Sequence, residues 1–240
     1  MSRELEICIA CDSLTASLRN AHEAAVGGAN RLECCASMHH GGLTPDPEII
    51  EAIRNAVPPD IAVLAMVRPR EGNFEWNPAE ADIIRQTISD MASAGANGIV
   101  SGALQGNELD TALTGELISR TRDAGMAFTF HRALDATADR MQALTTLIAL
   151  GCHRVLSAGT PWGSAMGATD GINELERMAA HHHGRMDLVV GGGISVASVR
   201  LLLPTLKHYS NISFHAYSSV IVDGYTDAGL VAVLRDALNA

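Results

Sequence analysis

The chain has 240 residues, 47% of them hydrophobic, with 17 basic and 27 acidic side chains and a formal net charge of −10. A chain this acidic is not expected to bind nucleic acid through a broad basic surface. No stretch approaches the roughly 18 uninterrupted apolar residues of a membrane span, and the start lacks the apolar core of a signal peptide, so we expect a cytoplasmic protein with no membrane partner. An odd count of 5 cysteines also argues against a disulfide framework.

Short apolar runs alternate along the chain with longer amphipathic stretches. The runs expected to form strands span residues 5–10, 31–35, 61–67, 98–104, 127–131, 154–158, 188–193 and 212–216. The stretches between them, such as 78–95 and 136–151, carry apolar residues at helical spacing. Several of these stretches end on a glycine, which is a typical helix stop signal.

Eight strand–helix units in 240 residues predict an α/β fold of the (β/α)8 TIM-barrel type. A doubly wound open sheet is the alternative, but it would usually have fewer strands and a glycine-rich turn after the first strand. The segment IACDSL after the first predicted strand contains no glycine. No linker or low-complexity segment divides the chain, so we expect a single barrel domain over residues 1–240.

Polar side chains stand where the predicted strands end, which is the functional end of a TIM barrel. Because side chains alternate along a strand, Glu6 and Cys8 share one face of the first strand, and Glu33 and Cys35 share one face of the second. The residues between them are large and apolar, as expected under the helices, so the polar set should point into the barrel. A buried ion pair that only fixes strand register is the structural alternative for the two glutamates.

Three arginines follow the third and fifth predicted strands. Arg68, Arg70 and Arg132 are suited to holding a carboxylate or a phosphate through paired hydrogen bonds. Ser157, and the glycine turn around Gly192, would add donors at the same end of the barrel. This pattern predicts a small anionic substrate.

Acid–base residues accompany the arginines. Glu6 or Glu33 would serve as a general base, with His131 or His215 as its acid partner. No lysine stands at a strand end, which argues against Schiff-base chemistry. Asp135 is expected to be the N-cap of the helix that follows it rather than a catalytic acid.

Two cysteines, Cys8 and Cys35, occupy matching positions on neighbouring predicted strands. Soft thiolates suit Cu(I), although cysteine is also among the residues most often buried as a small hydrophobe. The C-x-x-C spacing of Cys8 and Cys11 crosses a strand end, which is not the usual setting of a redox motif. His39 and His40 are the nearest further donors by sequence.

Seven segments resemble, in order, the signature segments of the CutC copper-homeostasis family: LEICIACDS, GGANRLECCASMHHGGLTP, MVRPREGNF, FTFHRALD, RVLSAG, VVGGGI and SFHA. The resemblance covers nearly the whole chain. It implies a TIM barrel, a cytoplasmic location, a homodimer and a part in copper tolerance that includes Cu(I) binding. It carries over residues Glu6, Cys8, Glu33, Cys35, Arg68, Arg70, His131, Arg132, Asp135, Ser157, Gly159 and His215, and it places Cys8 and Cys35 where proposed copper-binding members have cysteines.

Two functions therefore remain open. The first is a copper-homeostasis protein that binds Cu(I) through Cys8 and Cys35. The second is a barrel enzyme of the lyase, aldolase or isomerase type, with a small anion held by Arg68, Arg70 and Arg132. The sequence departs from the usual family pattern at His39, His40, Glu71 and Asn73, all beside the predicted barrel mouth, and this bears on which ligand is bound.

Overall fold

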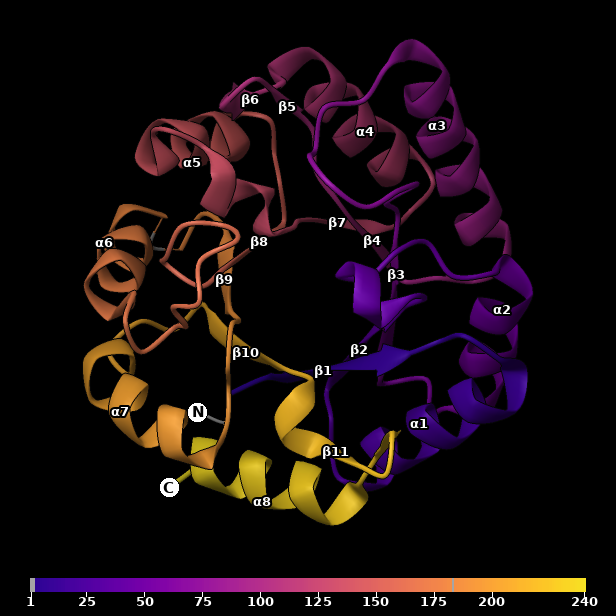
Figure 1. Ribbon diagram of the computed structural model, residues 1–240, viewed down its shortest axis with the longest axis vertical. Coiled ribbons are helices and arrows are strands. Elements are labelled where there is room, and N and C mark those ends of the chain that lie inside the picture. Colours follow the sequence, from indigo (N-terminus) through magenta and orange to yellow (C-terminus); the bar gives the residue numbers. More distant parts are fainter. Residues whose placement is uncertain (1–2, 183) are drawn as a thin grey trace.

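The structure, a computed structural model, describes residues 3–182 and 184–240. Parallel strands close into a barrel in the order β1-β10-β9-β8-β7-β4-β3-β2, with the helices around the outside (Figure 1). The predicted (β/α)8 TIM barrel is confirmed. No helix in the described part of the chain is long and apolar enough to cross a membrane.

Each barrel strand overlaps one of the eight apolar runs predicted from the sequence. The barrel strands are β1 (Leu5–Ala10), β2 (Arg31–Cys35), β3 (Ala62–Met66), β4 (Gly98–Ser101), β7 (Ala127–Phe130), β8 (Arg154–Ser157), β9 (Asp187–Val190) and β10 (Ile212–Ala216).

The helices lie between the strands, as the spacing of apolar residues predicts. They are α1 (Leu14–Val26), α2 (Pro47–Ala56), α3 (Pro78–Ser93), α4 (Thr111–Asp123), α5 (Arg140–Ala149), α6 (Ile172–His182), α7 (Val196–Leu206) and α8 (Ala228–Leu238). The helix-ending glycines adopt the positive φ expected of them, for example 81° at Gly95 and 75° at Gly125.

Small elements decorate the loops. Two hairpins pair β5 (Leu104–Gln105) with β6 (Glu108–Leu109) and β11 (Ile221–Val222) with β12 (Tyr225–Thr226). Three 3₁₀ turns are η1 (Met38–His40), η2 (Arg132–Ala136) and η3 (Ser218–Val220). The turns η1, η2 and η3 follow β2, β7 and β10 directly, so each lies at the carboxyl end of a barrel strand.

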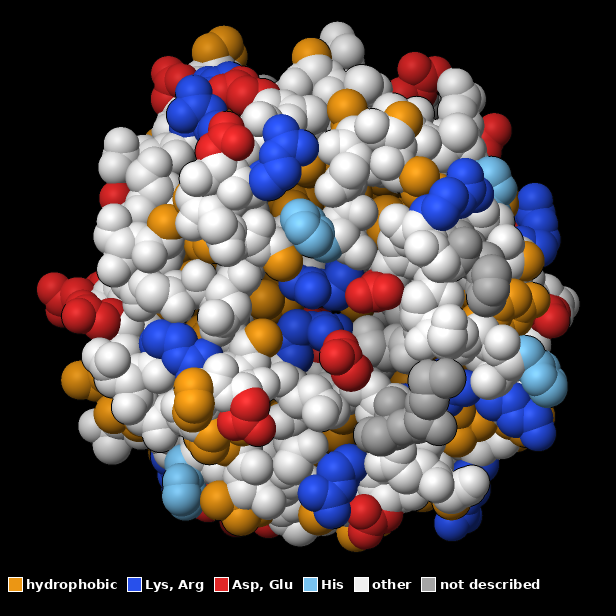
Figure 2. All heavy atoms as spheres, turned by 180° about the vertical axis from the view of Figure 1, so that it is seen from behind, with side chains coloured by type: hydrophobic (Ala, Val, Ile, Leu, Met, Phe, Trp, Pro, Cys, Tyr) orange, Lys and Arg blue, Asp and Glu red, His pale blue; other side chains and the backbone are white. Residues whose placement is uncertain are grey.

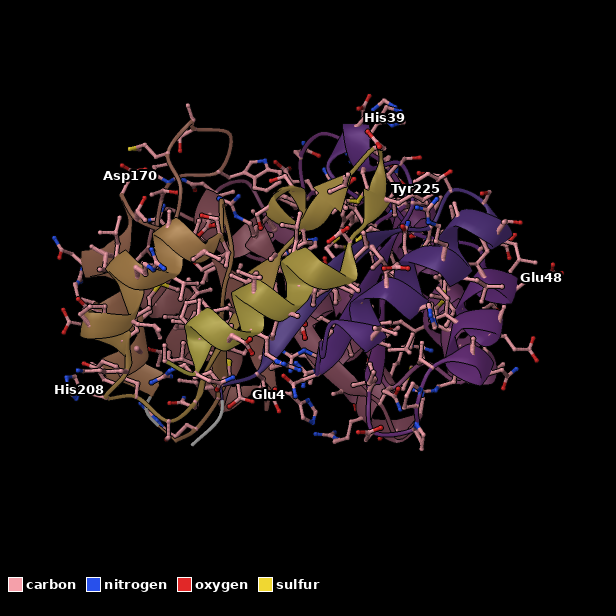
Figure 3. All side chains as sticks on the ribbon, turned by 90° about the horizontal axis from the view of Figure 1, so that it is seen from below. Glu4, His39, Glu48, Asp170, His208 and Tyr225 are labelled. Carbon is pink, nitrogen blue, oxygen red and sulfur yellow. The ribbon has the colours of Figure 1, made fainter. Side chains whose placement is uncertain are left out.

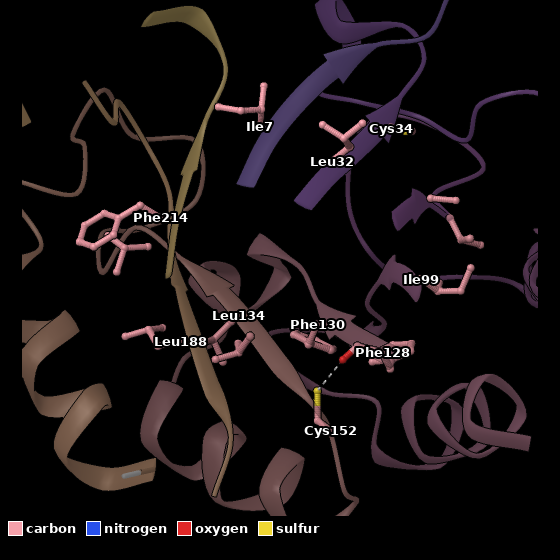
Figure 4. Packing of buried hydrophobic residues seen from close by; sticks show 14 of the residues in the cluster. Ile7, Leu32, Cys34, Ile99, Phe128, Phe130, Leu134, Cys152, Leu188 and Phe214 are labelled. Carbon is pink, nitrogen blue, oxygen red and sulfur yellow. Dashed lines mark hydrogen bonds between the residues drawn. The ribbon is translucent and has the colours of Figure 1, made fainter. Parts of the chain in front are cut away.

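The core has two layers. A large layer between the strands and the helices includes Ile7, Leu32, Phe128 and Phe214 (Figure 4), all fully buried. These residues alternate with the polar ones, which confirms the predicted direction of the side chains on β1 and β2. A smaller inner cluster inside the barrel consists of Cys8, Cys35, Leu64, Met66 and Val100, with Met38 and Tyr217 packed against it.

The two ends of the barrel differ. In a side view, His39, Asp170 and Tyr225 lie toward one end, and Glu4 and His208 lie toward the other (Figure 3). At the amino-terminal end, the guanidinium of Arg31 donates to Glu4 at 2.6 Å. Figure 2 shows arginine or lysine side chains and acidic side chains together near the centre of the face opposite to that of Figure 1. Both ends hold a cavity: the one at the amino-terminal end is lined by residues such as Arg3, Glu4 and Asp187, and the one at the carboxyl end by most of the predicted site residues.

Candidate functional site

A cavity of about 240 Å³ opens at the carboxyl ends of the strands. Its walls are formed by Cys8, Glu33, Cys35, Met38, Gly41, Gly42, Met66, Arg68, Phe74, His131, Arg132, Leu156, Trp162, His215 and Tyr217. The fold thus brings together seven residues that the sequence nominated: Cys8, Glu33, Cys35, Arg68, His131, Arg132 and His215. It also adds Met38 and the aromatic side chains of Phe74, Trp162 and Tyr217, which the sequence analysis did not single out.

Glu6 lies beneath this cavity and not in its wall. Its carboxylate is fully buried, accepts a hydrogen bond from Nε of Arg31 at 2.5 Å, and lies 2.7 Å from Nδ1 of His215. Burial alone would raise the pKa of Glu6, but the charge of Arg31 and the hydrogen bond from His215 outweigh it and hold this pKa well below its ordinary value. Glu6 is therefore an ionised anchor for Arg31 and His215. The sequence could have indicated Arg31 as a partner inside the barrel, because Arg31 lies on the same strand face as Glu33.

Glu33 stands beside Cys8 in the register of β1 and β2. Its Oε1 is 3.5 Å from the sulfur of Cys35, whereas its buried Oε2 has no hydrogen-bond partner among the described residues. Burial, opposed by the charge of His215 and reinforced by that of Cys8, raises the pKa of Glu33 to about 8. A carboxyl group with such a pKa can hold or release a proton near neutral pH.

Cys8, Cys35 and Met38 bring three sulfur atoms to one wall of the cavity. The sulfurs of Cys8 and Met38 are 3.9 Å apart, and the thiol of Cys35 lies 3.5 Å from Oε1 of Glu33. The hydrogen bond from Cys35, opposed by burial and assisted by His215, lowers the pKa of Cys8 to about 6. The same pair raises the pKa of Cys35 well above its ordinary value, so one thiolate forms first and the second only with difficulty.

His215 connects the carboxylates to the thiol. Burial disfavours its charged form, but Glu33, Cys8 and Glu6 together raise the pKa of His215 well above its ordinary value. One ligand atom each of Cys8, Glu33 and His215 lie within 4.8 Å of one another. This group has the donor types of a metal site, although its protons must leave before an ion can bind.

His131 forms another part of the wall. Its Nδ1 accepts the backbone N–H of Ala133 at 3.2 Å, and its ring lies 4.8 Å from that of Phe74. Burial and the neighbouring charge of Arg68 lower the pKa of His131 to about 3, so the ring is neutral. Its Nε2 is buried without a hydrogen-bond partner among the described residues and is suited to donating a hydrogen bond to a ligand.

The arginines take different roles. Arg68 is almost fully buried and donates to the carbonyl oxygens of His40, Gly41 and Gly42 and to that of Gly72. Its terminal nitrogens thus bind the loops over the cavity. Arg132 pairs through Nε with Asp135 at 2.8 Å, lies 5.2 Å from the ring centre of Trp162, and keeps 26% of its side chain exposed.

Three predicted substrate-binding residues do not reach the cavity wall. Arg70 turns away after Pro69, pairs with Glu80 at 2.6 Å and stacks on Trp76. Ser157 is buried and donates to Asp135 at 2.5 Å. Gly192 uses its carbonyl oxygen to accept the N–H of Ala168 at 2.8 Å, which closes a loop against the end of β8.

The expected N-cap role of Asp135 is wrong. Asp139 caps α5 instead, because its carboxylate accepts the N–H of Gln142 at 2.9 Å. Asp135 is buried in η2, where it accepts from Ser157 and from the N–H of Ala158 and pairs with Arg132. It therefore ties the ends of β7 and β8 together.

The two histidines of the loop after β2 also lie apart from the thiols. His40 is paired with Glu71, and its ring lies 4.0 Å from that of His39. Neither ring is part of the cavity wall. The same loop instead brings the thioether of Met38, the residue before His39, to 3.9 Å from the sulfur of Cys8.

The family model described as "CutC family" matches residues 3–212. This chain belongs to the CutC family. CutC family proteins from Vibrio atlanticus and Aliivibrio fischeri are 33% and 35% identical to it, the first over the whole of both chains and the second over 85% of this chain and 78% of the relative. A solved structure provisionally described as the copper homeostasis protein CutC of Streptococcus agalactiae has a TM-score of 0.78 at 24% identity, and covers 89% of this chain and 98% of its own. At that identity the likeness shows the shared CutC barrel and no more.

The donors of this CutC chain suit a copper ion. Thiolates and thioethers are the soft ligands that select Cu(I), and the inner cluster offers both types in a buried setting. The cysteines Cys11, Cys34 and Cys152 are also buried but belong to the outer layer of the core. The sulfur-rich wall is therefore the part of the barrel whose donors would fit Cu(I).

Proposed function

We propose that this chain binds Cu(I) through Cys8 and Cys35 at the barrel mouth and takes part in copper homeostasis. The carrying observation is that Cys8 and Cys35, both on the inner face of β1 and β2, line one cavity and belong to one buried inner cluster. Staggered strands do not guarantee such an arrangement, since Cys8 pairs in register with Glu33 and Cys35 lies two residues further along. Both sulfurs are nevertheless part of one cavity wall. The cytoplasmic location and the homodimer implied by the family resemblance stay predictions.

The test is an anaerobic competition titration of Cu(I) between the protein and a strong chelator. We expect about one ion per chain, held with the tightness of two thiolates. The double substitution Cys8→Ser and Cys35→Ser should abolish this binding. Cys152→Ser is the matched control, because Cys152 belongs to the outer core layer and its thiol donates to the carbonyl oxygens of Phe128 and Arg154, as a hydroxyl can do. Copper binding that survives the double substitution would overturn the proposal.

A second function, an enzyme acting on a small anion, is favoured by Oε2 of Glu33 and Nε2 of His131, two buried atoms without a hydrogen-bond partner among the described residues. These atoms belong to the cavity that Arg132 also lines, so a proton donor or acceptor, a neutral hydrogen-bond donor and a cation face one space. A crystal soaked with phosphate or a carboxylate should show the anion within hydrogen-bond reach of Arg132 or Arg68. Anions found elsewhere, with an empty mouth, would count against this function.

A further inference from the structure

We propose that Met38 is the third ligand of the copper ion, so that the site holds Cu(I) with three sulfur atoms. This inference rests on the proposed Cu(I) binding by Cys8 and Cys35. Two thiolates alone leave a soft ion open to solvent and to competing donors, whereas a thioether adds a third soft ligand without adding charge.

The distances favour a shared ion. Sulfurs that share one ion at bonds of about 2.3 Å, the length of a zinc–thiolate bond, lie about 4 Å apart in a trigonal arrangement. The Cys8 and Met38 sulfurs are 3.9 Å apart. A Cβ atom built on Gly42 would lie 3.3 Å from the sulfur of Cys35 and 4.0 Å from that of Met38, so both sulfurs lie against the backbone of the same loop glycine.

The loop that carries Met38 is held firmly in place. Ser37 adopts the left-handed conformation with φ 50°, which is uncommon outside glycine, and its N–H donates to Asp12 at 2.7 Å. Ala36 and Leu43 exchange backbone hydrogen bonds of 2.9 and 2.7 Å across the base of the loop. Such a conformation persists only where its surroundings enforce it, and here it presents the Met38 sulfur to the thiols.

The glycines of this loop allow the close approach. Gly41 and Gly42 have φ of 78° and 83°, and Arg68 binds the carbonyl oxygens of both. A side chain on Gly42 would occupy space next to the sulfurs of Cys35 and Met38. The loop backbone thus lies over the sulfur wall, and the sulfurs of Cys8, Cys35 and Met38 are the soft donors beneath it.

The experiment compares Met38→Leu with Met66→Leu. Leucine keeps the approximate volume of methionine and removes the sulfur. Met66 is the matched control because it lines the same cavity and packs in the same inner cluster, but its sulfur makes no hydrogen bond with Cys8 among the described residues. We expect the Cu(I) dissociation constant to rise at least tenfold in Met38→Leu and to change less than twofold in Met66→Leu.

X-ray absorption of the Cu(I)-loaded wild-type protein supplies a readout that does not depend on how a variant folds. The spectrum should require three sulfur scatterers around copper, and two in Met38→Leu. Two sulfurs in the wild type, or nitrogen and oxygen scatterers from His215 and Glu33 in place of the third, would overturn the role of Met38 while leaving copper binding by the cysteines intact. Cu(I) binding that is absent from the wild type, or that survives loss of both cysteines, would overturn the proposed function and this inference together.

Discussion

Glu6 and His215 join the first and last strands of the barrel through a 2.7 Å contact between Oε1 and Nδ1. The same carboxylate accepts from Arg31 of β2 at 2.5 Å, so three neighbouring strands meet at one buried charge. Glu33, one strand away, has an oxygen with no hydrogen-bond partner among the described residues, 4.0 Å from Nδ1 of His215. The two glutamates nominated together by the sequence thus have different roles: Glu6 organises the site, and Glu33 faces it.

We expect Glu6→Gln to lower the free energy of unfolding by about 3 kcal/mol at neutral pH, because it leaves the buried charge of Arg31 without its main partner. Chemical denaturation measures this. Glu4→Gln is the control, since Glu4 also pairs with Arg31 but is 59% exposed, and its loss should cost less than about 1 kcal/mol. Equal effects of the two substitutions would contradict the anchoring role of Glu6.

Glu33→Gln should instead remove a pH dependence. The pKa of Glu33 is about 8 in the folded chain and ordinary in the unfolded chain, so between these values the folded state binds more protons. Wild-type stability should therefore fall, relative to Glu33→Gln, as pH rises from about 4.5 to 8. Denaturation midpoints of both proteins across this range give the difference, and a constant difference would show that Glu33 is ionised throughout.

His131→Asn should change the pH dependence of stability below pH 6.5, and in the opposite direction to Glu33→Gln. The folded-state pKa of His131 is about 3, below the unfolded value of about 6.5, so between these values the unfolded state binds more protons. The wild type should lose up to about 1.4 kcal/mol per pH unit relative to the variant as pH falls from 6.5 towards 3. Asparagine can keep the acceptor for the Ala133 N–H. Parallel pH–stability curves for the two proteins would contradict a neutral buried ring.

Arg68→Lys should loosen the loop over the cavity. Lysine cannot span the carbonyl oxygens of His40, Gly41 and Gly42 in the way that a guanidinium does. Hydrogen exchange should accelerate at least tenfold at the amides of Gly41 and Leu43, which bond to Met38 and Ala36.

Arg70→Lys is the control for that experiment. Arg70 binds the carbonyl oxygens of Glu71, Asn73 and Glu75 and leaves the loop after β2 untouched. Its loss should affect exchange only in residues 71–75. An unchanged exchange rate at Gly41 and Leu43 in Arg68→Lys would show that the loop is held without Arg68.

The strands and the direction of their side chains could be predicted because both depend on local periodicity. A run of apolar residues with polar ones on alternate positions specifies a strand with one face inside the barrel, as at Glu6 and Cys8. The eight runs and the glycine-terminated helices between them therefore determined the barrel. Parallel strands in a barrel all end on the same side, so the convergence of Glu33, His131 and His215 followed as well.

The partner of each polar side chain was decided only by the tertiary structure. Arg70 and Arg132 both follow strand ends in the sequence. In the structure Arg70 pairs with Glu80 outside the cavity, whereas Arg132 lines the cavity. Met38 looked like an ordinary loop residue until the conformation of residues 37–42 brought its sulfur to Cys8. Such outcomes depend on strand stagger and on competition among partners that are distant in the chain, as Glu6 and Arg31 are. Local sequence patterns do not specify the distances between such partners.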